Sequence, residues 1–351
     1  MRPFKGDSTA SYFNNLKNKC MKKVKETIGI DVSKLTLDVY LKTTKVHQQF
    51  SNDSKGFKQL ISWCKKQKVN LDETLFCFEH TGWYCLLLSY FLYENKYAYC
   101  CVNAIEIKRS MGLRRGKSDK ADAWEIANYA WLRRDELVPS TPPAKKLIEL
   151  QRMMSLREQL VKQLTASKNL YKGMQDLVSD EVNDVSIVIL KENMVQLNNQ
   201  ITAIEKAMNE LIKNDETMIN NYKLSKTVKG VGMVLAVQML LHTHNYTRFE
   251  SSRQFSAYCG LVPYPYQSGT SIHGRHKIHG ISDKKMKSLL SMSAISAIQH
   301  DKELKLYYQK RVEEGKPKMV VLNIIRNKIV SRVFATVNRG TPYVEISKFC
   351  A

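Results

Sequence analysis

The sequence lacks the features that would tie it to an oxidising compartment or to a membrane. Its eight cysteines include no C-x-x-C pair, and several lie in apolar runs, where free thiols behave as small hydrophobic side chains. This pattern argues against a zinc site or a disulfide framework. No uninterrupted apolar run reaches the roughly 18 residues of a membrane span, and the N-terminus has no secretory hydrophobic region. We therefore expect a soluble intracellular protein with no membrane partner.

Acidic residues are also scarce, because 33 Asp and Glu oppose 55 Lys and Arg, giving a formal net charge of +22. Such a surplus repels itself in a compact chain and predicts a polyanionic partner. Nucleic acid is favoured, since neutralising each phosphate releases counterions. From Lys223 onwards there are 21 Lys and Arg against 7 Asp and Glu. A membrane-surface helix is the alternative, but no long basic stretch carries a Trp, Phe or Leu face. We expect the last third to bind nucleic acid.

The chain divides by pattern into a mixed α/β region followed by two helical regions. Prolines at 139, 142 and 143 mark the end of the first region. The predicted segments are a basic tail (1–23), an α/β domain (24–142), a helical middle (143–222), a mainly helical C-terminal domain (223–345) and a short tail (346–351).

The helical middle carries a heptad-like repeat. Apolar residues follow one another at spacings of three and four, which is typical of a coiled-coil seam: Met194, Leu197, Ile201, Ile204, Met208 and Leu211. A matching stripe precedes them: Leu150, Met153, Leu156, Leu160 and Leu164. The pattern predicts an antiparallel helical hairpin, a dimerisation coiled coil, or both.

The stretch from residue 27 to 41 is typical of a β-hairpin in which Asp31 faces away from the apolar side. Ile28, Ile30 and Val32 fall on one face by the period-two rule, as do Leu35, Leu37, Val39 and Leu41 after the turn. Asp31 points the other way, beside Gly29. A carboxylate in an apolar strand is costly to desolvate unless a cation compensates it. Asp31 is therefore either a strand-end residue that reaches solvent or a metal ligand.

Three further carboxylates lie at the ends of predicted elements. Glu79 ends a short buried strand (75–78), whereas Asp119 and Asp122 share the first turn of a helix that Ser118 caps. Acidic residues at a helix start also complement the helix dipole, which is the plainer interpretation. Four carboxylates in this order, on a strand meander with helices, are the arrangement by which RNase H-like nucleases hold two divalent metals. Mg²⁺, or Mn²⁺, prefers such hard oxygen ligands.

Two C-terminal stretches have compositions suited to phosphate. Gly230-Val231-Gly232 precedes an apolar helix, where backbone N–H groups would face an anion, although a simple tight turn is equally compatible. The segment from 264 to 280 is predicted as a loop rich in Gly, hydroxyl, His and Arg side chains. His273, His276 and His279 lack the spacing of four that helical metal ligands need. The residues expected to contact nucleic acid are Arg114, Arg115, Lys117, Lys229, Gly230, Gly232, Arg275, Lys277, Lys284 and Lys285.

From about residue 27 to 344 the sequence resembles the DEDD transposases of the IS-one-hundred-and-ten type, which are related to the Piv pilin-gene invertases. The basic extension 1–23 lies outside the match. The resemblance rests on the order and separation of these motifs: Gly29-Ile30-Asp31-Val32-Ser33-Lys34, Glu79 with Thr81-Gly82, Lys117-Ser118-Asp119-Lys120-Ala121-Asp122-Ala123, Gly230-Val231-Gly232, Tyr258-Cys259-Gly260-Leu261-Val262-Pro263 and Gln267-Ser268-Gly269.

The resemblance implies a RuvC-like domain, a coiled coil and a C-terminal transposase domain with a serine nucleophile. By motif that serine is Ser268, with Ser271 as the nearest rival and an ordinary turn serine as the plain interpretation. The implied reaction joins DNA strands through a phosphoserine intermediate, with metals held by Asp31, Glu79, Asp119 and Asp122. Members of this family are guided by a bridge RNA and act as homo-oligomers. The implied location is the bacterial cytoplasm, at the nucleoid when DNA is bound.

Two competing hypotheses remain at this stage. A RuvC-like junction nuclease would use the same four carboxylates with water as the nucleophile, and its C-terminal domain would only bind DNA. A non-catalytic scaffold would bind nucleic acid and dimerise through the coiled coil. The carboxylates count against the scaffold, because acidic groups in a DNA-binding groove weaken binding unless metals neutralise them.

Overall fold

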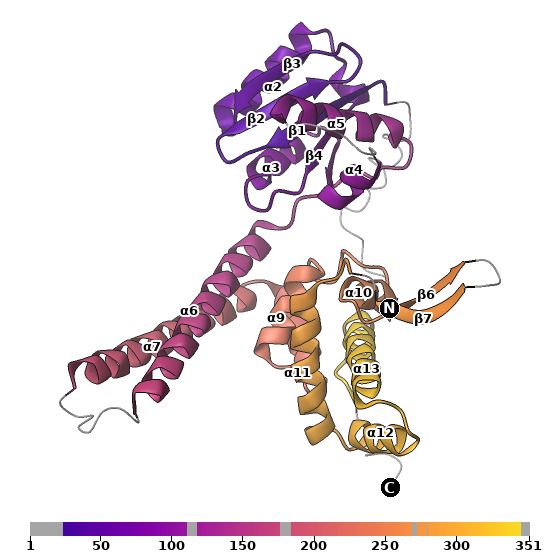
Figure 1. The fold of residues 1–351 in the computed structure, drawn as a ribbon. Helices are drawn as coiled ribbons and strands as arrows, with labels where there is room; N and C mark the ends of the chain where they lie inside the picture. Colours follow the sequence, from indigo (N-terminus) through magenta and orange to yellow (C-terminus); the bar gives the residue numbers. More distant parts are fainter. Residues whose placement is uncertain (1–23, 111–117, 176–183, 269–271, 279, 345–351) are drawn as a thin grey trace, which may run out of the picture. The chain divides into compact units, whose positions relative to one another are not determined.

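The computed structural model describes residues 24–110, 118–175, 184–268, 272–278 and 280–344, and within these it gives no side-chain placement for 267–268, 272–273 and 275–277. The chain separates into two compact units, with the boundary between Pro142 and Pro143 (Figure 1). Each unit has its own hydrophobic core. No helix in the described part of the chain is long and apolar enough to cross a membrane.

The first unit is built on a five-stranded mixed sheet. Its strands are β1 (Glu26–Val32), β2 (Thr36–Leu41), β3 (His47–Ser51), β4 (Thr74–Glu79) and β5 (Tyr99–Val102). They lie in the order β3-β2-β1-β4-β5. β1, β2 and β3 run antiparallel, whereas β4 and β5 run parallel to β1. The predicted hairpin and strand meander are therefore confirmed.

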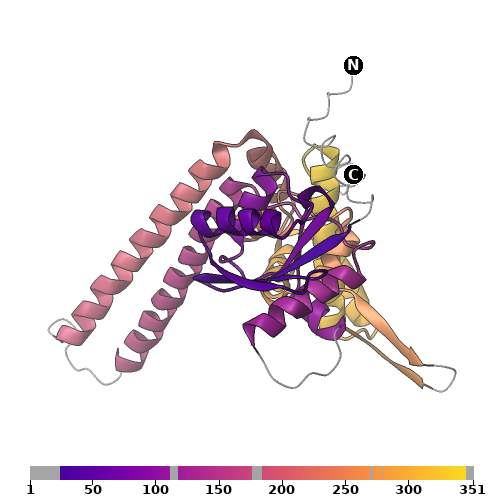
Figure 2. The same ribbon diagram turned by 90° about the horizontal axis from the view of Figure 1, so that it is seen from above.

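Helices cover both faces of this sheet (Figures 1 and 2). Helices α2 (Ser54–Lys66) and α3 (Leu86–Glu94) pack on the face that carries Ile28 and Ile30. Helices α4 (Ala104–Ser110) and α5 (Asp119–Leu132) pack on the opposite face. A 3-10 turn (Leu71–Glu73) precedes β4. Leu35 was expected on the apolar face but is 73% exposed, because the turn before β2 extends to this residue.

The second unit begins with two long helices, α6 (Lys145–Gln175) and α7 (Val185–Lys213). They run antiparallel, since Arg157 Nε lies 2.6 Å from Glu205 Oε1 whereas Asn193 contacts Ser167 further along. Leu160, Leu164 and Leu197 are buried between the helices. The predicted helical hairpin is confirmed. The expectation for Leu156 was wrong, because this side chain is 51% exposed.

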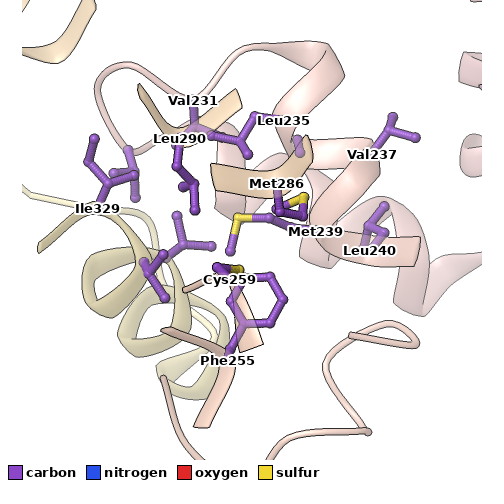
Figure 3. Packing of buried hydrophobic residues seen from close by; sticks show 14 of the residues in the cluster. Val231, Leu235, Val237, Met239, Leu240, Phe255, Cys259, Met286, Leu290 and Ile329 are labelled. Carbon is purple, nitrogen blue, oxygen red and sulfur yellow. The ribbon is translucent and has the colours of Figure 1, made fainter. Parts of the chain in front are cut away.

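Six shorter helices complete the described part of the second unit: α8 (Glu216–Lys226), α9 (Met233–His242), α10 (Ser252–Tyr258), α11 (Lys284–His300), α12 (Lys302–Glu313) and α13 (Lys318–Arg339). Phe255 and Cys259 pack with Met239, Met286 and Ile329 in their shared core (Figure 3). The inner end of α6 joins the same core through Leu147, Leu150 and Met154. The base of the helical hairpin is therefore fixed to the C-terminal helices. The separation of 143–222 and 223–345 into two domains stays a prediction.

A two-stranded antiparallel ribbon, β6 (Pro263–Ser268) and β7 (Ile272–Ile278), leaves the second unit between α10 and α11. The sequence predicted a loop here, and that prediction was wrong. The loop was predicted from the many Gly, hydroxyl, His and Arg side chains of this segment. The strand β6 also contains Pro263 and Pro265, which cannot donate to a sheet. In a two-stranded ribbon each strand is an edge, so the missing N–H group is tolerated.

Candidate active site

Asp31 lies on the face of the sheet that α5 covers. Two residues earlier on β1, Gly29 lies so close to α5 that a Cβ there would come within 2.2 Å of both the Ala123 carbonyl oxygen and the Ala127 nitrogen. Alternate residues of a strand share a face. Asp31 is therefore on the same side as Gly29, near the beginning of α5.

Two neighbouring strands bring carboxylates to the same place. β4 runs parallel to β1 with Ile30 paired to Phe78, and the next residue on β4 is Glu79. On the other side, antiparallel β2 pairs Asp38 directly with Asp31. Residues paired across neighbouring strands share a face. Asp38, Asp31 and Glu79 consequently form a row across three strands.

The first turn of α5 adds the remaining two carboxylates. Ser118 caps this helix, since its Oγ accepts a hydrogen bond from Ala121 N at 3.2 Å. Asp119 and Asp122 follow within the first turn, where they also complement the helix dipole. The dipole explains why acids are tolerated there, but it does not explain their position beside three strand carboxylates.

The electrostatics of Asp31 confirm that these groups lie close together. Burial and then the charges of Asp122, Asp119, Asp38 and Glu79, in decreasing order of effect, together raise the pKa of the Asp31 carboxyl to about 6. A carboxylate repels nearby carboxylates, so each of them favours the protonated form of Asp31. The structure thus collects four carboxylates predicted from the sequence and one that was not predicted.

The donor set has the chemistry of a hard divalent cation site. In the part of the chain that the structure describes, no three His, Cys, Asp or Glu side chains already surround a common point as metal ligands. The group around Asp31 nevertheless consists only of carboxylates, and the largest influences on Asp31 all disfavour its charge. Mg²⁺ and Mn²⁺ prefer oxygen ligands, and a cation would offset the accumulated negative charge. The residues therefore fit such an ion.

Asp38 is the member that the sequence analysis missed. It is only 5% exposed, and its carboxylate is fixed by two side chains of β3. His47 Nε2 lies 2.9 Å from its Oδ1, and Gln49 Nε2 donates to its Oδ2 at 3.0 Å. The alternation of Leu37, Val39 and Leu41 toward the core was the available signal. It places Asp38 on the opposite face, where Asp31 points.

Ser268 is the last residue of β6, opposite Ile272 on β7, at the far end of the ribbon. Its side chain is not described, and Ser271 and His279 lie outside the described residues. The base of the ribbon is held by a polar cluster that joins three helices. Tyr258 OH lies 2.9 Å from His242 Nδ1 and donates to Asp283 Oδ2 at 3.1 Å. Burial raises the pKa of Tyr258 to about 12.

The glycines of the predicted phosphate-binding turn have different roles. Gly230 has a φ of +85°, and a Cβ there would lie 2.5 Å from the Ser293 carbonyl oxygen. Close packing on α11 therefore accounts for this glycine without a ligand. Gly232 precedes α9 as its N-cap, and nothing would obstruct a Cβ there. Its open position leaves the helix N-terminus accessible.

The basic residues predicted to contact nucleic acid are spread over both units. Lys229 and Lys284 are exposed. Lys285 Nζ lies 2.6 Å from Glu158 Oε2, so part of its charge is used within the protein. Arg275 and Lys277 lie on β7, and their side chains are not described. Arg114, Arg115 and Lys117 lie outside the described residues, as do the two terminal tails.

Comparison with known proteins assigns the class. A transposase family model for DEDD proteins of the IS110 type matches residues 28–178, and a second model, described as the transposase IS116/IS110/IS902 family, matches residues 222–309. The pilin gene-inverting protein of Moraxella lacunata is 27% identical over 91% of this chain and 98% of its own length. The corresponding protein of Moraxella bovis is 25% identical over the same shares. An uncharacterised insertion element IS110 protein of Streptomyces coelicolor is 26% identical over 46% of this chain and 38% of its own length.

These matches define a class of enzyme that acts on DNA by strand cleavage and rejoining. Within that class, the chain belongs to the IS110 family of insertion-sequence transposases and recombinases. The hypothesis of a non-catalytic scaffold is therefore wrong. Membership of this family distinguishes an enzyme from a binding protein, which the residue types alone could not do.

Proposed function

We propose that the first unit is an RNase H-like, RuvC-like nuclease domain whose Asp31, Glu79, Asp119 and Asp122 hold Mg²⁺ or Mn²⁺. The observation that carries the proposal is the convergence of these carboxylates on Asp31 from β1, β4 and α5. The strand order, with three antiparallel strands followed by two parallel ones, supports it. Bound divalent cations would neutralise charge that develops on a DNA phosphate during strand transfer.

The second part of the proposal gives Ser268 the role of nucleophile. Its hydroxyl oxygen forms a bond to a DNA phosphorus, the bond from phosphorus to the leaving deoxyribose oxygen breaks, and that oxygen takes up a proton. A second DNA hydroxyl then attacks the phosphoserine and regenerates Ser268. The position of Ser268 at the end of an exposed ribbon, in the motif Gln267-Ser268-Gly269, supports this role.

Donor and target DNA are the expected substrates, and a bridge RNA is the expected guide. The net charge of +22, concentrated after Lys223, supports polyanionic partners in general. The names of the relatives suggest two outcomes, inversion for the pilin gene-inverting proteins and insertion for the insertion-element protein. The long α6–α7 hairpin is the proposed coiled-coil contact of a homo-oligomer. The proposed location is the bacterial cytoplasm, with nucleoid association on DNA.

One observation favours a second candidate, a metal-dependent junction nuclease that uses water. Asp31 and the four carboxylates around it all belong to the first unit, so the group is formed without any residue of the ribbon. Water would then attack the phosphate, and Ser268 would be an ordinary turn residue. The two mechanisms differ in whether the protein becomes covalently attached to DNA.

The test is a strand-transfer assay with full-length protein co-purified with its cellular RNA. Labelled DNA that spans the element ends is incubated with Mg²⁺ and separated under denaturing conditions. A covalent adduct in the native protein and in Ser271→Ala, but not in Ser268→Ala, supports the phosphoserine mechanism. Loss of all cleavage in Asp119→Asn, with a folded protein, supports the carboxylate site.

Cleavage without an adduct, unchanged in Ser268→Ala, would refute the serine mechanism and leave the water-dependent nuclease. Cleavage that persists in Asp119→Asn would refute the proposed role of the carboxylates. The Ser271→Ala variant is the matched control, because it removes a hydroxyl three residues away in the same stretch. An adduct that disappears only in Ser271→Ala would move the nucleophile to that residue.

A further inference from the structure

Arg326 of α13 is a buried cation for which the described part of the chain supplies no balancing anion. The side chain is 4% exposed, and its Nε has no hydrogen-bond partner. Its Nη1 donates to Asn323 Oδ1, one turn earlier in the same helix, at the long distance of 3.3 Å. Within the described residues no carboxylate forms an ion pair with it. A guanidinium carries five N–H donors, and the hydrogen bond to Asn323 is the one that the described residues accept from it.

A second cation, Lys287, lies on the neighbouring helix α11. Helices α11 and α13 pack together, and Lys287 of α11 is partly buried. Burial and then Arg326 lower the pKa of Lys287, so the two positive groups are close enough to repel each other. Burying one unpaired charge is costly, and placing a like charge beside it increases the cost. Such an arrangement is explained when an anion from outside the chain binds there.

The same helix shows how a buried arginine is satisfied when its role is structural. Two turns further along α13, Arg332 Nη1 lies 2.7 Å from Asp301 Oδ2, and its Nη2 lies 2.8 Å from Glu303 Oε2. Both of its partners are carboxylates of this chain. Arg326 has none in the described residues. The contrast separates an arginine that stabilises the fold from one whose counter-ion is missing.

Arg326 also lies beside the base of the ribbon. Asn323 and Asn327, which flank it on α13, both donate through Nδ2 to the carbonyl oxygen of Leu261, at 2.7 Å and 3.3 Å. Leu261 precedes the first residue of β6 by two positions. A ligand held by Arg326 would therefore be held where the ribbon joins the helical core.

We propose that Arg326 and Lys287 form a phosphate-binding site for the backbone of the DNA substrate at the base of the β6–β7 ribbon. A guanidinium binds phosphate through two parallel hydrogen bonds, and the lysine adds a point charge. Because the enzyme acts on DNA, a backbone phosphate is the anion that the ribbon base would meet. The site does not depend on Ser268 or on metal ions, so a test of DNA affinity can fail without affecting the tests of the serine and of the carboxylates.

The experiment measures the affinity of full-length protein for a fluorescent DNA duplex of about 30 base pairs at several salt concentrations between about 50 and 200 mM. Arg326→Met should weaken binding about tenfold and reduce the slope of log affinity against log salt by about one. Lys287→Met should reduce the slope in the same way. Lys328→Met is the matched control, because it also removes one positive charge from α13. The Nζ of Lys328 lies 4.5 Å from the ring centroid of Tyr307 and is not part of the proposed site. The control should retain nearly the native slope.

Thermal melting without DNA separates binding from folding. Since Arg326 has no carboxylate partner, Arg326→Met should melt at or above the native temperature. Arg326→Lys, which keeps the charge, should keep most of the salt slope. An unchanged slope in Arg326→Met, or a loss equal to that of Lys328→Met, would overturn the proposal. If Arg326→Met does not fold, Lys287→Met decides, and a native slope in that variant overturns the site. A loss for single-stranded RNA but not for duplex DNA would overturn DNA as the ligand.

Discussion

The contact between Gly29 and α5 yields a prediction about both stability and activity. In Gly29→Ala the added Cβ would lie 2.2 Å from two backbone atoms of α5, whereas ordinary van der Waals contacts begin at 3.4 Å. The helix must therefore move by roughly 1 Å, and overpacking of this kind typically costs about 1–3 kcal/mol. We expect the upper end, about 3 kcal/mol, because backbone atoms cannot rotate away. The start of α5 carries Asp119 and Asp122, so strand cleavage should fall as well.

Tryptophan fluorescence during urea unfolding reports on the first unit of the chain, because all four tryptophans, at 63, 83, 124 and 131, lie in that unit. With a slope of about 2 kcal/mol per molar urea, the midpoint should fall by roughly 1.5 M. Gly232→Ala is the control, since its Cβ would meet nothing within 4 Å. Ala127→Gly should not rescue Gly29→Ala, because the clash involves the backbone. A native midpoint in Gly29→Ala would refute the close packing of α5 on β1.

Three further predictions concern charge. Asp31→Asn should stabilise the metal-free first unit at pH 7.5 and abolish cleavage. The folded-state pKa of Asp31, about 6, exceeds its ordinary value of 3.8, so ionisation of Asp31 lowers the stability as pH rises from about 4 through 6. We expect a gain of about 1–2 kcal/mol in the variant after discounting for partial exposure. Burial, Arg248 and His242 lower the pKa of His244 to about 4. The native protein should therefore lose about 1–2 kcal/mol of stability as pH drops from about 6.5 through 4, whereas His244→Asn should not show this loss. Unfolding followed by circular dichroism at several pH values measures the difference. Arg332→Met should cost about 3–5 kcal/mol in urea unfolding, because it leaves buried Asp301 unpaired.

Each of these predictions has an outcome that contradicts it. A less stable Asp31→Asn at pH 7.5 would mean that neighbouring charges do not repel Asp31. An unchanged pH dependence in His244→Asn would assign the acid sensitivity to another group; asparagine suits this site because His244 has a φ of 48°. For Arg332, the control is Arg311→Met, whose exposed pair with Glu314 should contribute far less to stability because solvent screens it. Equal losses in the two arginine variants would remove the distinction.

Much of the first unit follows from local sequence rules. Period-two alternation was enough to place Ile28 and Ile30 in the core and Asp31 on the other face, and Ser118 marked the start of α5. The ribbon was missed because its Gly, hydroxyl, His and Arg side chains are typical of a loop, and the pairing of β6 with β7 cannot be read from either stretch alone. Local rules identify an element when its own residues determine it, and fail when a partner strand does.

The candidate site shows the same division. Asp31, Asp119 and Asp122 each had a plain local explanation, and only the register of β1 with β4 and the packing of α5 bring them together with Glu79. Their order along the chain suggested the grouping, and the family resemblance agreed with it. Arg326 had no signal at all, since an arginine in a basic helix looks the same whether or not it is paired. Its missing partner is a property of how α11 and α13 pack.

The length of the β6–β7 ribbon determines how far from the helical core a residue at its end can lie. From Pro263 to Ser268 the strand spans about 17 Å, and Tyr264 and Tyr266 along it are 47% and 67% exposed. The ribbon is thus an extended element that is anchored at one end in a helical core. Adding two residues to each strand would lengthen it by about 7 Å and keep every side chain on its face, whereas adding one would turn the far end over. If Ser268 has the role proposed above, strand length in steps of two would set how far from the helical core it meets a DNA phosphate.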